Sequence, residues 1–237
     1  MNKLSIIILS FLGAGLMACS SIYIANQTGT LIPIEKGEEQ TSNMEESITP
    51  YRDSLDQEMN LIIAQADTNF IVERPSGNLN NWVASAILTH QTKHVRLSIP
   101  VVCLLNTGGL RSSINKGPVT LADIFKIMPF DNTVVWVKMP IESLSDIQEY
   151  LLKSGGEPIA NASLKDGQLL INGVSKETKE FLVITSDYLA NGGDKMNFFK
   201  KAIEKNDTGI LMRDCLIEEA KNQGTLVSEP TPRIELK

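Results

Sequence analysis

Two loops built around consecutive glycines carry side chains that can recognise a small molecule. The first spans 106–111 (Asn-Thr-Gly-Gly-Leu-Arg) and the second spans 188–194 (Tyr-Leu-Ala-Asn-Gly-Gly-Asp), and each follows an apolar run, at 99–105 and 181–185. Glycine tolerates positive φ and has no Cβ, so a strand that ends in such a turn can bring its backbone close to a ligand. The first loop adds a guanidinium, and the second adds an aromatic ring and a carboxylate.

Aromatic residues make up only 5% of the chain, yet two of them lie at turns. Phe130 follows Pro129, and Tyr188 opens the second glycine loop. Turns face solvent, so a ring at a turn needs a reason. Two such rings can hold a purine between them, and stacking contributes about 1–3 kcal/mol per ring. The alternative is that each ring only covers the edge of the domain.

Charge and spacing argue against several other functions. The net charge is −6 and no basic cluster is present, so nucleic acid is not an expected partner. His90 and His94 have the i, i+4 spacing of a zinc pair, but no Glu accompanies them and Lys93 lies between them, which favours solvated surface. No Ser/His/Asp constellation is visible, and we expect no catalytic residue and no metal site in this chain.

The first residues have the pattern of an export signal. Lys3 precedes an apolar stretch, 4–17, that is short for a membrane span. The stretch ends in Leu-Met-Ala-Cys, which resembles a bacterial lipobox with Cys19 as the lipidated residue. We therefore expect a signal peptide at 1–19, a tether at 20–46 and a folded domain at 47–237. The expected location is the bacterial cell envelope, in the periplasm, with a lipid anchor outside the cytoplasmic membrane, at the outer membrane.

The remaining pattern predicts an α+β fold with mixed sheets. Apolar periodicity and breakers predict helices at 55–66, 76–89, 120–127, 141–153, 198–205 and 209–222, and strands at 99–105, 133–139, 181–185 and 232–234. Hairpin-type turns are expected at 165–167 and 171–173. Cys103 and Cys215 are expected on a buried strand and a helix face, where a free thiol or a disulfide is possible.

The two glycine loops and the turn at 128–132 together resemble the C-terminal, substrate-binding domain of the 5'-nucleotidase family. The run Gly77-Asn78-Leu79 also fits its pattern, although the family often has an arginine where Phe70 stands. The resemblance covers 47–237 and implies a layered α/β/β/α domain. It implies that Phe130 and Tyr188 stack on the base. The implied ligand-binding residues are Asn106, Gly108, Gly109, Arg111, Phe130, Asn132, Tyr188, Gly192, Gly193 and Asp194.

The resemblance further assigns roles to single residues. Asp194 matches the residue that accepts hydrogen bonds from both ribose hydroxyls, while without the family it reads as a turn-stabilising aspartate. Arg111 matches the arginine near the sugar and phosphate, while without the family it reads as half of a surface ion pair. Asn106 matches the head of its loop, and Asn132 matches a base contact. The expected partner is a purine nucleoside or nucleotide.

The family reaction is metal-assisted hydrolysis of a phosphate ester in nucleotide catabolism. Its metal ligands belong to a metallophosphatase domain that we do not find in this sequence, so divalent metals are expected only in a partner chain. We expect a split 5'-nucleotidase in which this chain recognises the substrate and is inactive alone, and whether it counts as an enzyme is open. The alternatives are a stand-alone nucleoside-binding module of the envelope and a degenerate structural lipoprotein.

Overall fold

The computed structural model describes residues 43–229 and 231–236. The chain divides into two units, Met1–Glu46 and Ser47–Lys237, and the description below concerns the second. The expected signal peptide, Cys19 and the tether up to residue 42 lie outside the described residues. Helix α2 (Asn43–Met59) contains the boundary between the units. In the described part of the chain, no helix combines the length and the apolar character that crossing a membrane requires.

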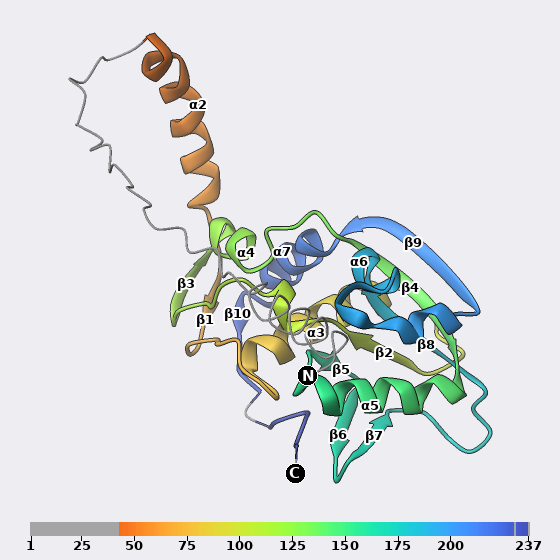
Figure 1. Ribbon diagram of the computed structural model, residues 1–237. Coiled ribbons are helices and arrows are strands. Elements are labelled where there is room, and N and C mark those ends of the chain that lie inside the picture. The colour runs from red at the N-terminus through yellow and green to blue at the C-terminus, as the bar shows by residue number, and fades with distance from the viewer. Residues whose placement is uncertain (1–42, 230, 237) are drawn as a thin grey trace, which may run out of the picture. The chain divides into compact units, whose positions relative to one another are not determined.

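A five-stranded mixed sheet forms the centre of the domain (Figure 1). Its order is β5 (Ile159–Ala160), β2 (Val101–Leu104), β8 (Glu180–Ser186), β4 (Thr133–Pro140) and β9 (Glu204–Leu211). Strands β2 and β8 are parallel, with Val101 opposite Leu182, and the other pairs are antiparallel. Strand β2 is apolar and buried at every position, as expected for a strand covered on both faces.

Each face of this sheet is covered by helices. Helices α3 (Asn78–Thr92) and α7 (Met212–Gln223) pack on one face and against each other. The other face packs on α5 (Leu144–Ser154), α6 (Asp187–Ala190) and the 3-10 helix η4 (Asn197–Lys201). Two apolar clusters therefore fill the domain, one on each side of the central sheet.

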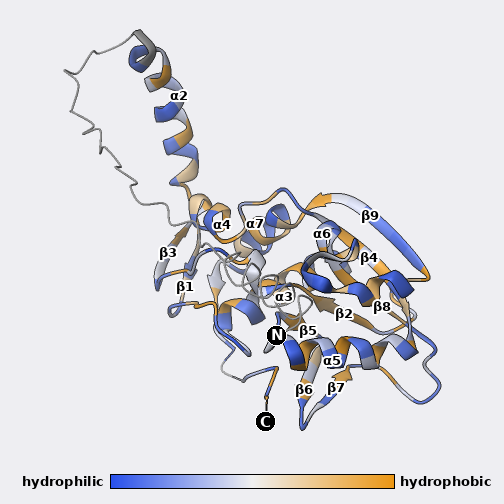
Figure 2. Ribbon diagram, in the orientation of Figure 1, coloured by the Kyte–Doolittle hydropathy of each residue, from blue (hydrophilic) through white to orange (hydrophobic). Residues whose placement is uncertain are grey.

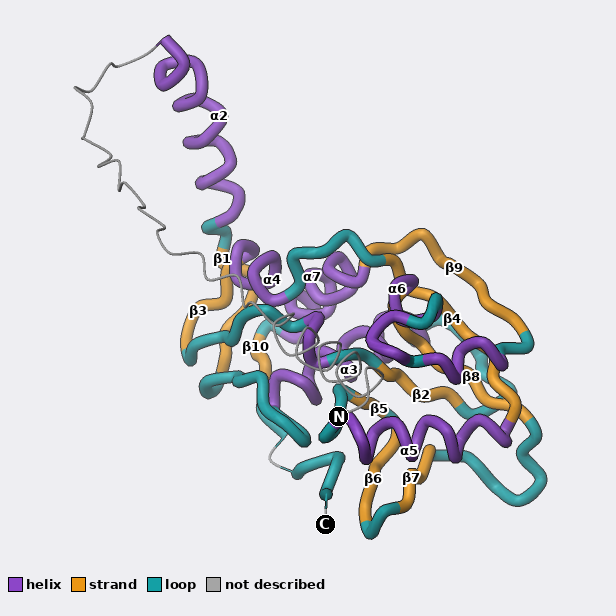
Figure 3. Tube along the Cα trace, viewed as in Figure 1, coloured by secondary structure: helices purple, strands orange, loops and turns teal. Residues whose placement is uncertain are grey.

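Two smaller sheets complete the fold. A three-stranded sheet has the order β10 (Thr225–Leu226), β1 (Ile62–Ala66) and β3 (Gly117–Thr120), and β1 contacts α7. Figure 3 shows α3 and α7 between this sheet and the central one. Strands β6 (Ala162–Lys165) and β7 (Gln168–Ile171) form a hairpin. The expected α+β domain with mixed sheets is confirmed. Helices α3 and α7 lie between the two sheets, which differs from the layer order α/β/β/α that the resemblance implied.

Several local predictions are confirmed by their capping interactions. Helix α4 (Leu121–Ile127) begins at a capping box in which the Thr120 side chain accepts from the backbone N–H of Asp123, and the Asp123 carboxylate accepts from that of Thr120. Helix α5 follows the 3-10 turn η2 (Ile141–Ser143) and ends at Gly155, which has φ = 81°. A left-handed residue at this position favours glycine.

Other local predictions are wrong. Residues 62–66, expected to continue a helix, form β1. Residues 204–205 and 209–211, expected to be parts of two helices, belong to β9. Both strands are held by pairing with a neighbouring strand, which local periodicity does not reveal. Figure 2 shows β9 blue along its first half and white to orange towards its end. Strand β3 was not expected, and near residue 234 only an isolated bridge to Leu164 forms.

The two cysteines of the domain core are free thiols. Cys103 on β2 and Cys215 on α7 are both buried. Burial raises the pKa of Cys215 to about 11 and raises that of Cys103 further. Burial thus disfavours the nucleophilic thiolate form of both cysteines.

Candidate functional site

The parallel pairing of β2 and β8 brings the two glycine loops together. Strand β2 continues into η1 (Thr107–Gly109), while β8 continues into α6 and then η3 (Gly193–Lys195). The carboxyl ends of parallel neighbouring strands lie at the same edge of a sheet, which is a common place for a binding crevice. Loops that are far apart in the sequence thereby become neighbours.

A cavity of about 440 Å³ lies at this edge. Its volume is in the range of small-molecule sites. Eight of the ten residues predicted from the sequence line it: Asn106, Gly108, Gly109, Arg111, Phe130, Asn132, Tyr188 and Asp194. Gly192 and Gly193 are not among its lining residues. That these eight bind a ligand remains a prediction.

Asp194 is the centre of a hydrogen-bond network in this cavity. Its Oδ2 accepts from Asn106 Nδ2 at 2.6 Å, and its Oδ1 accepts from the hydroxyl of Tyr188 at 2.9 Å. The backbone oxygen of Asp194 accepts from the hydroxyl of Tyr150 at 3.1 Å. Asp194 itself has φ = 49°, in the left-handed region. The carboxylate is thus held in place from two loops, and each of its oxygens keeps acceptor capacity for a further donor.

Gly193 is required by the position of the Tyr188 ring. A Cβ at residue 193 would lie 2.4 Å from Cε1 of Tyr188. The ring therefore packs on the glycine backbone while its hydroxyl is bonded to Asp194, and 49% of Tyr188 stays exposed. This combination gives a fixed aromatic surface that faces the cavity.

The second aromatic ring comes from the turn between α4 and β4. Phe130 lies on this turn and is 51% exposed. Asn132, at the end of the same turn, donates from Nδ2 to Oδ1 of Asp187 at 2.8 Å, which ties the turn to the start of α6. The Phe130 turn and the Tyr188 loop are thus linked by a side-chain hydrogen bond.

Arg111 is the cationic residue among those lining the cavity. Its backbone N–H donates to the carbonyl oxygen of Ile127 at 2.8 Å, and its Nη1 donates to that of Gly108 at 3.3 Å. The backbone is therefore fixed, while the guanidinium keeps donors available to an anion.

Glu157 supports the first glycine loop, and sequence reasoning missed it. Its side chain is 3% exposed. Its Oε2 accepts from the backbone N–H of Thr107 at 2.7 Å, and its Oε1 accepts from Nη2 of Arg74 at 2.9 Å. Arg74 also donates to the carbonyl oxygens of Ser154 and Gly156 at the end of α5. Nothing in the sequence around Glu157, which follows Gly155 and Gly156, indicates that it supports the first glycine loop.

The contacts of Tyr150 and Phe70 were also not predicted from the sequence. Tyr150 reaches the loop of Asp194 from α5, and its pKa is raised to about 12 by burial and by the nearby carboxylates of Glu157 and Asp194. Phe70, which stands where the family often has an arginine, is fully buried and packs edge-on against Trp82. Position 70 therefore contributes to the core.

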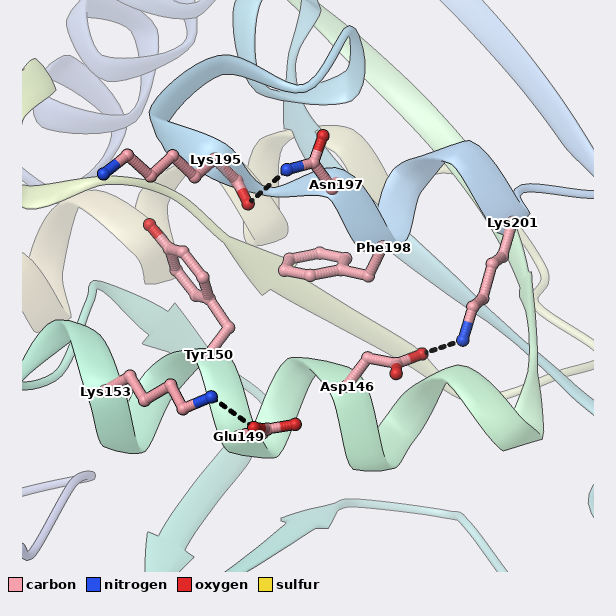
Figure 4. Close-up of a pocket in the computed structure, with 8 residues that line it drawn as sticks. All are labelled: Asp146, Glu149, Tyr150, Lys153, Lys195, Asn197, Phe198 and Lys201. Carbon is pink, nitrogen blue, oxygen red and sulfur yellow. Dashed lines mark hydrogen bonds and ion pairs between the residues drawn. The ribbon is translucent and has the colours of Figure 1, made fainter.

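A second hollow, of about 340 Å³, lies between α5 and the segment η3–η4 (Figure 4). Two of its lysines are paired with carboxylates of α5, Lys201 with Asp146 at 2.6 Å and Lys153 with Glu149. The Phe198 ring that lines it is 6% exposed, so it offers little stacking surface. The cavity at the β2–β8 edge is better suited to a planar ligand because its rings are half exposed.

The described residues contain no group of three or more His, Cys, Asp or Glu that could hold a metal ion. His90, on α3, has Nε2 at 3.0 Å from Oε2 of Glu218 on α7. His90, the first residue of the zinc-like pair, thus contacts a carboxylate of a neighbouring helix.

The N-terminal half of this domain is similar to a known protein family. Residues 62–154 match the family model described as 5'-nucleotidase, C-terminal domain. This region contains α3, the first glycine loop and the Phe130 turn. These residues are therefore similar to a 5'-nucleotidase C-terminal domain, and the chain covers only this domain region of its relatives.

Individual relatives agree with this assignment. The chain is 23% identical over 233 residues to the trifunctional nucleotide phosphoesterase protein YfkN of Bacillus subtilis, with 87% of this chain and 16% of that protein covered. It is 31% identical over 102 residues to protein UshA of Escherichia coli, with 38% of this chain and 18% of that protein covered. The chain thus spans less than a fifth of the length of these two relatives.

Solved structures show the same fold. The 5'-nucleotidase precursor of Thermus thermophilus superposes with a TM-score of 0.66 at 20% identity, covering 81% of this chain and 42% of that one. The NAD nucleotidase of Haemophilus influenzae superposes with a TM-score of 0.60 at 18% identity, covering 82% and 41%. At these identities the likeness concerns the fold.

Proposed function

We propose that the domain binds a purine nucleoside or nucleotide in the cavity at the β2–β8 edge. The observation that carries this proposal is the arrangement of two half-exposed rings, Phe130 and Tyr188, around a cavity that also contains the carboxylate of Asp194. The rings supply stacking surfaces for a planar base. The carboxylate supplies acceptors for the ribose hydroxyls.

Arg111 determines whether the phosphate contributes to affinity. As the cation lining the cavity, it is the side chain that would pair with a 5'-phosphate. The backbone N–H of the neighbouring Gly109 already donates to the carbonyl oxygen of Asn106 at 3.1 Å. An exposed ion pair of this kind adds little, about 0–1 kcal/mol. We therefore expect AMP to bind only slightly more tightly than adenosine, and more so at low salt.

The domain would supply substrate recognition to a metallophosphatase. Hydrolysis of a phosphate ester in this family needs two metal ions, and the described residues offer no cluster that could hold them. We propose that the ligands come from a separately encoded metallophosphatase chain, which together with this domain forms a split 5'-nucleotidase. The fold and the names of the relatives that act on nucleotides support this proposal.

Calorimetric titration of the full chain in mild detergent, with adenosine and then with AMP, tests the binding. Phe130→Ala and Tyr188→Ala should each weaken binding about tenfold or more, because each removes one stacking surface. Tyr51→Ala, which removes an exposed ring on α2, is the matched control and should bind normally. No heat with either ligand at millimolar concentration would refute the assigned site.

The proposed partnership has its own test. AMP is incubated with the chain alone and with a candidate metallophosphatase chain, in Mn²⁺ or Zn²⁺, and the release of inorganic phosphate is measured. The split enzyme requires both chains for hydrolysis. Tight adenosine binding without any gain in hydrolysis would instead support the stand-alone binding module.

We also propose that Cys19 is lipidated and anchors the domain outside the cytoplasmic membrane. The lipobox pattern supports this, and stable anchoring by acyl chains requires about two of them. The full chain should partition into the detergent phase of a temperature-induced separation, and Cys19→Ala should move it to the aqueous phase. Equal partitioning of both proteins would refute the anchor.

A further inference from the structure

The turn that carries Phe130 is held by one buried arginine. Arg213, the second residue of α7, is 8% exposed. Its Nη1 donates to the carbonyl oxygen of Met128 at 3.3 Å, and its Nη2 donates to Oδ1 of Asp131 at 2.6 Å. The guanidinium thus binds the chain on both sides of Phe130.

Neighbouring contacts fix the arginine itself. Its Cζ lies 4.2 Å from the centre of the Phe125 ring on α4, a cation–π geometry. The backbone N–H of Met212 donates to the carbonyl oxygen of Asn132 at 2.9 Å. The start of α7 therefore holds the turn from Met128 to Asn132 along its whole length.

Burying the Arg213 guanidinium is unfavourable for the stability of the fold. A buried guanidinium loses hydration, and its pairing with Asp131, whose side chain is 77% exposed, returns only part of that cost. Its Nε is buried and finds no hydrogen-bond partner among the residues that the structure describes. An apolar side chain of similar length would pack against Phe125 without these costs, so the interaction is better explained by what it positions.

We infer that Arg213 is a positioning residue that sets the place of the Phe130 ring opposite Tyr188, and so the width of the slot for the base. The inference rests on the proposed function, since it assigns Arg213 a role in nucleoside binding. Arg213 is not among the residues that line the cavity, so it acts through the turn and not through the ligand.

A double-mutant cycle tests this role in the full chain, with adenosine affinity measured by calorimetry. Arg213→Met should weaken binding about tenfold in the otherwise normal chain and less than about twofold in the Phe130→Ala background, because contacting residues couple. Lys221→Met removes an exposed positive charge from the same helix and is the control. Normal affinity of Arg213→Met, or an equal loss in both backgrounds, would overturn the inference.

Hydrogen exchange without ligand separates this inference from the proposed function. In Arg213→Met the amides of 128–132 should exchange at least about tenfold faster, while those of 188–194 keep their rate. If the normal chain does not bind adenosine, the proposed function fails, and the exchange experiment still decides whether Arg213 holds the turn. Unchanged exchange at 128–132 would overturn the inference by itself.

Discussion

Asn106 and Asp194, which belong to different loops, are joined by a hydrogen bond of 2.6 Å between Nδ2 and Oδ2. The bond connects the end of β2 with the segment after β8, 88 residues away. It is a charge-assisted bond, shorter than a neutral amide contact. The carboxylate is consequently oriented before any ligand arrives, which lowers the entropic cost of binding.

We expect Asp194→Ala to weaken adenosine binding about tenfold or more, because hydrogen bonds to a charged group contribute about 1.5–3 kcal/mol each. The same variant should lose less affinity for 2',3'-dideoxyadenosine, since this analogue lacks both hydroxyls and is affected only through the released Tyr188 and Asn106 side chains. Calorimetry with the two ligands measures the difference. An equal loss for both would show that Asp194 supports the loop and does not contact the ribose.

Gly193→Ala should displace the Tyr188 ring, because the added Cβ would lie 2.4 Å from it. We expect adenosine affinity to fall about as much as in Tyr188→Ala, roughly tenfold. In the Tyr188→Ala background the same substitution should have little further effect, since the obstructing ring is gone. A full additional loss there would place the cause elsewhere in the loop.

Glu157→Ala should lower the free energy of unfolding by about 2–3 kcal/mol, because it leaves the amide of Thr107 and part of Arg74 without their acceptor. Urea unfolding measures this loss. Glu149→Ala removes an exposed carboxylate paired with Lys153 on α5 and should cost less than about 1 kcal/mol. Similar values for both variants would argue against a supporting role for Glu157.

Tyr150 should make the folded state less stable in alkali. Its pKa is raised to about 12 in the folded chain, above the ordinary value of 10.0, so the folded state holds this proton more tightly. The contribution is complete below about pH 10 and is lost as the pH rises towards about 12. Between these values the free energy of unfolding should fall more steeply for the normal chain than for Tyr150→Phe, and identical slopes would contradict the assignment.

The sequence predicted local structure correctly where that structure depends on contacts between residues close together in the chain. The capping box of Thr120 and Asp123 and the glycine that ends α5 depend on residues within a few positions, and both are confirmed. Strands β1 and β9 depend on partners far along the chain, so their composition misled the prediction. Strand β9 is mostly polar and exposed, and only its pairing with β4 makes it a strand.

In the candidate site, too, residues in local motifs were predicted and residues that act from distant elements were not. The lining residues were found because two glycine loops and an aromatic turn form recognisable motifs. Glu157, Tyr150 and Arg213 were not found, because each acts on a loop from a different element and has no pattern of its own. Supporting residues of this kind become visible only when the fold brings them to the loop.

The parallel pairing of β2 and β8 has a consequence for folding kinetics. The walls of the cavity follow strands β2 and β8, which are far apart in the sequence, so no short fragment around either loop contains both walls. Pairings of such long sequence separation are slow to form. A nucleoside that contacts both loops would therefore bind only chains in which this pairing has formed, and its binding during refolding would report the formation of the β2–β8 pair.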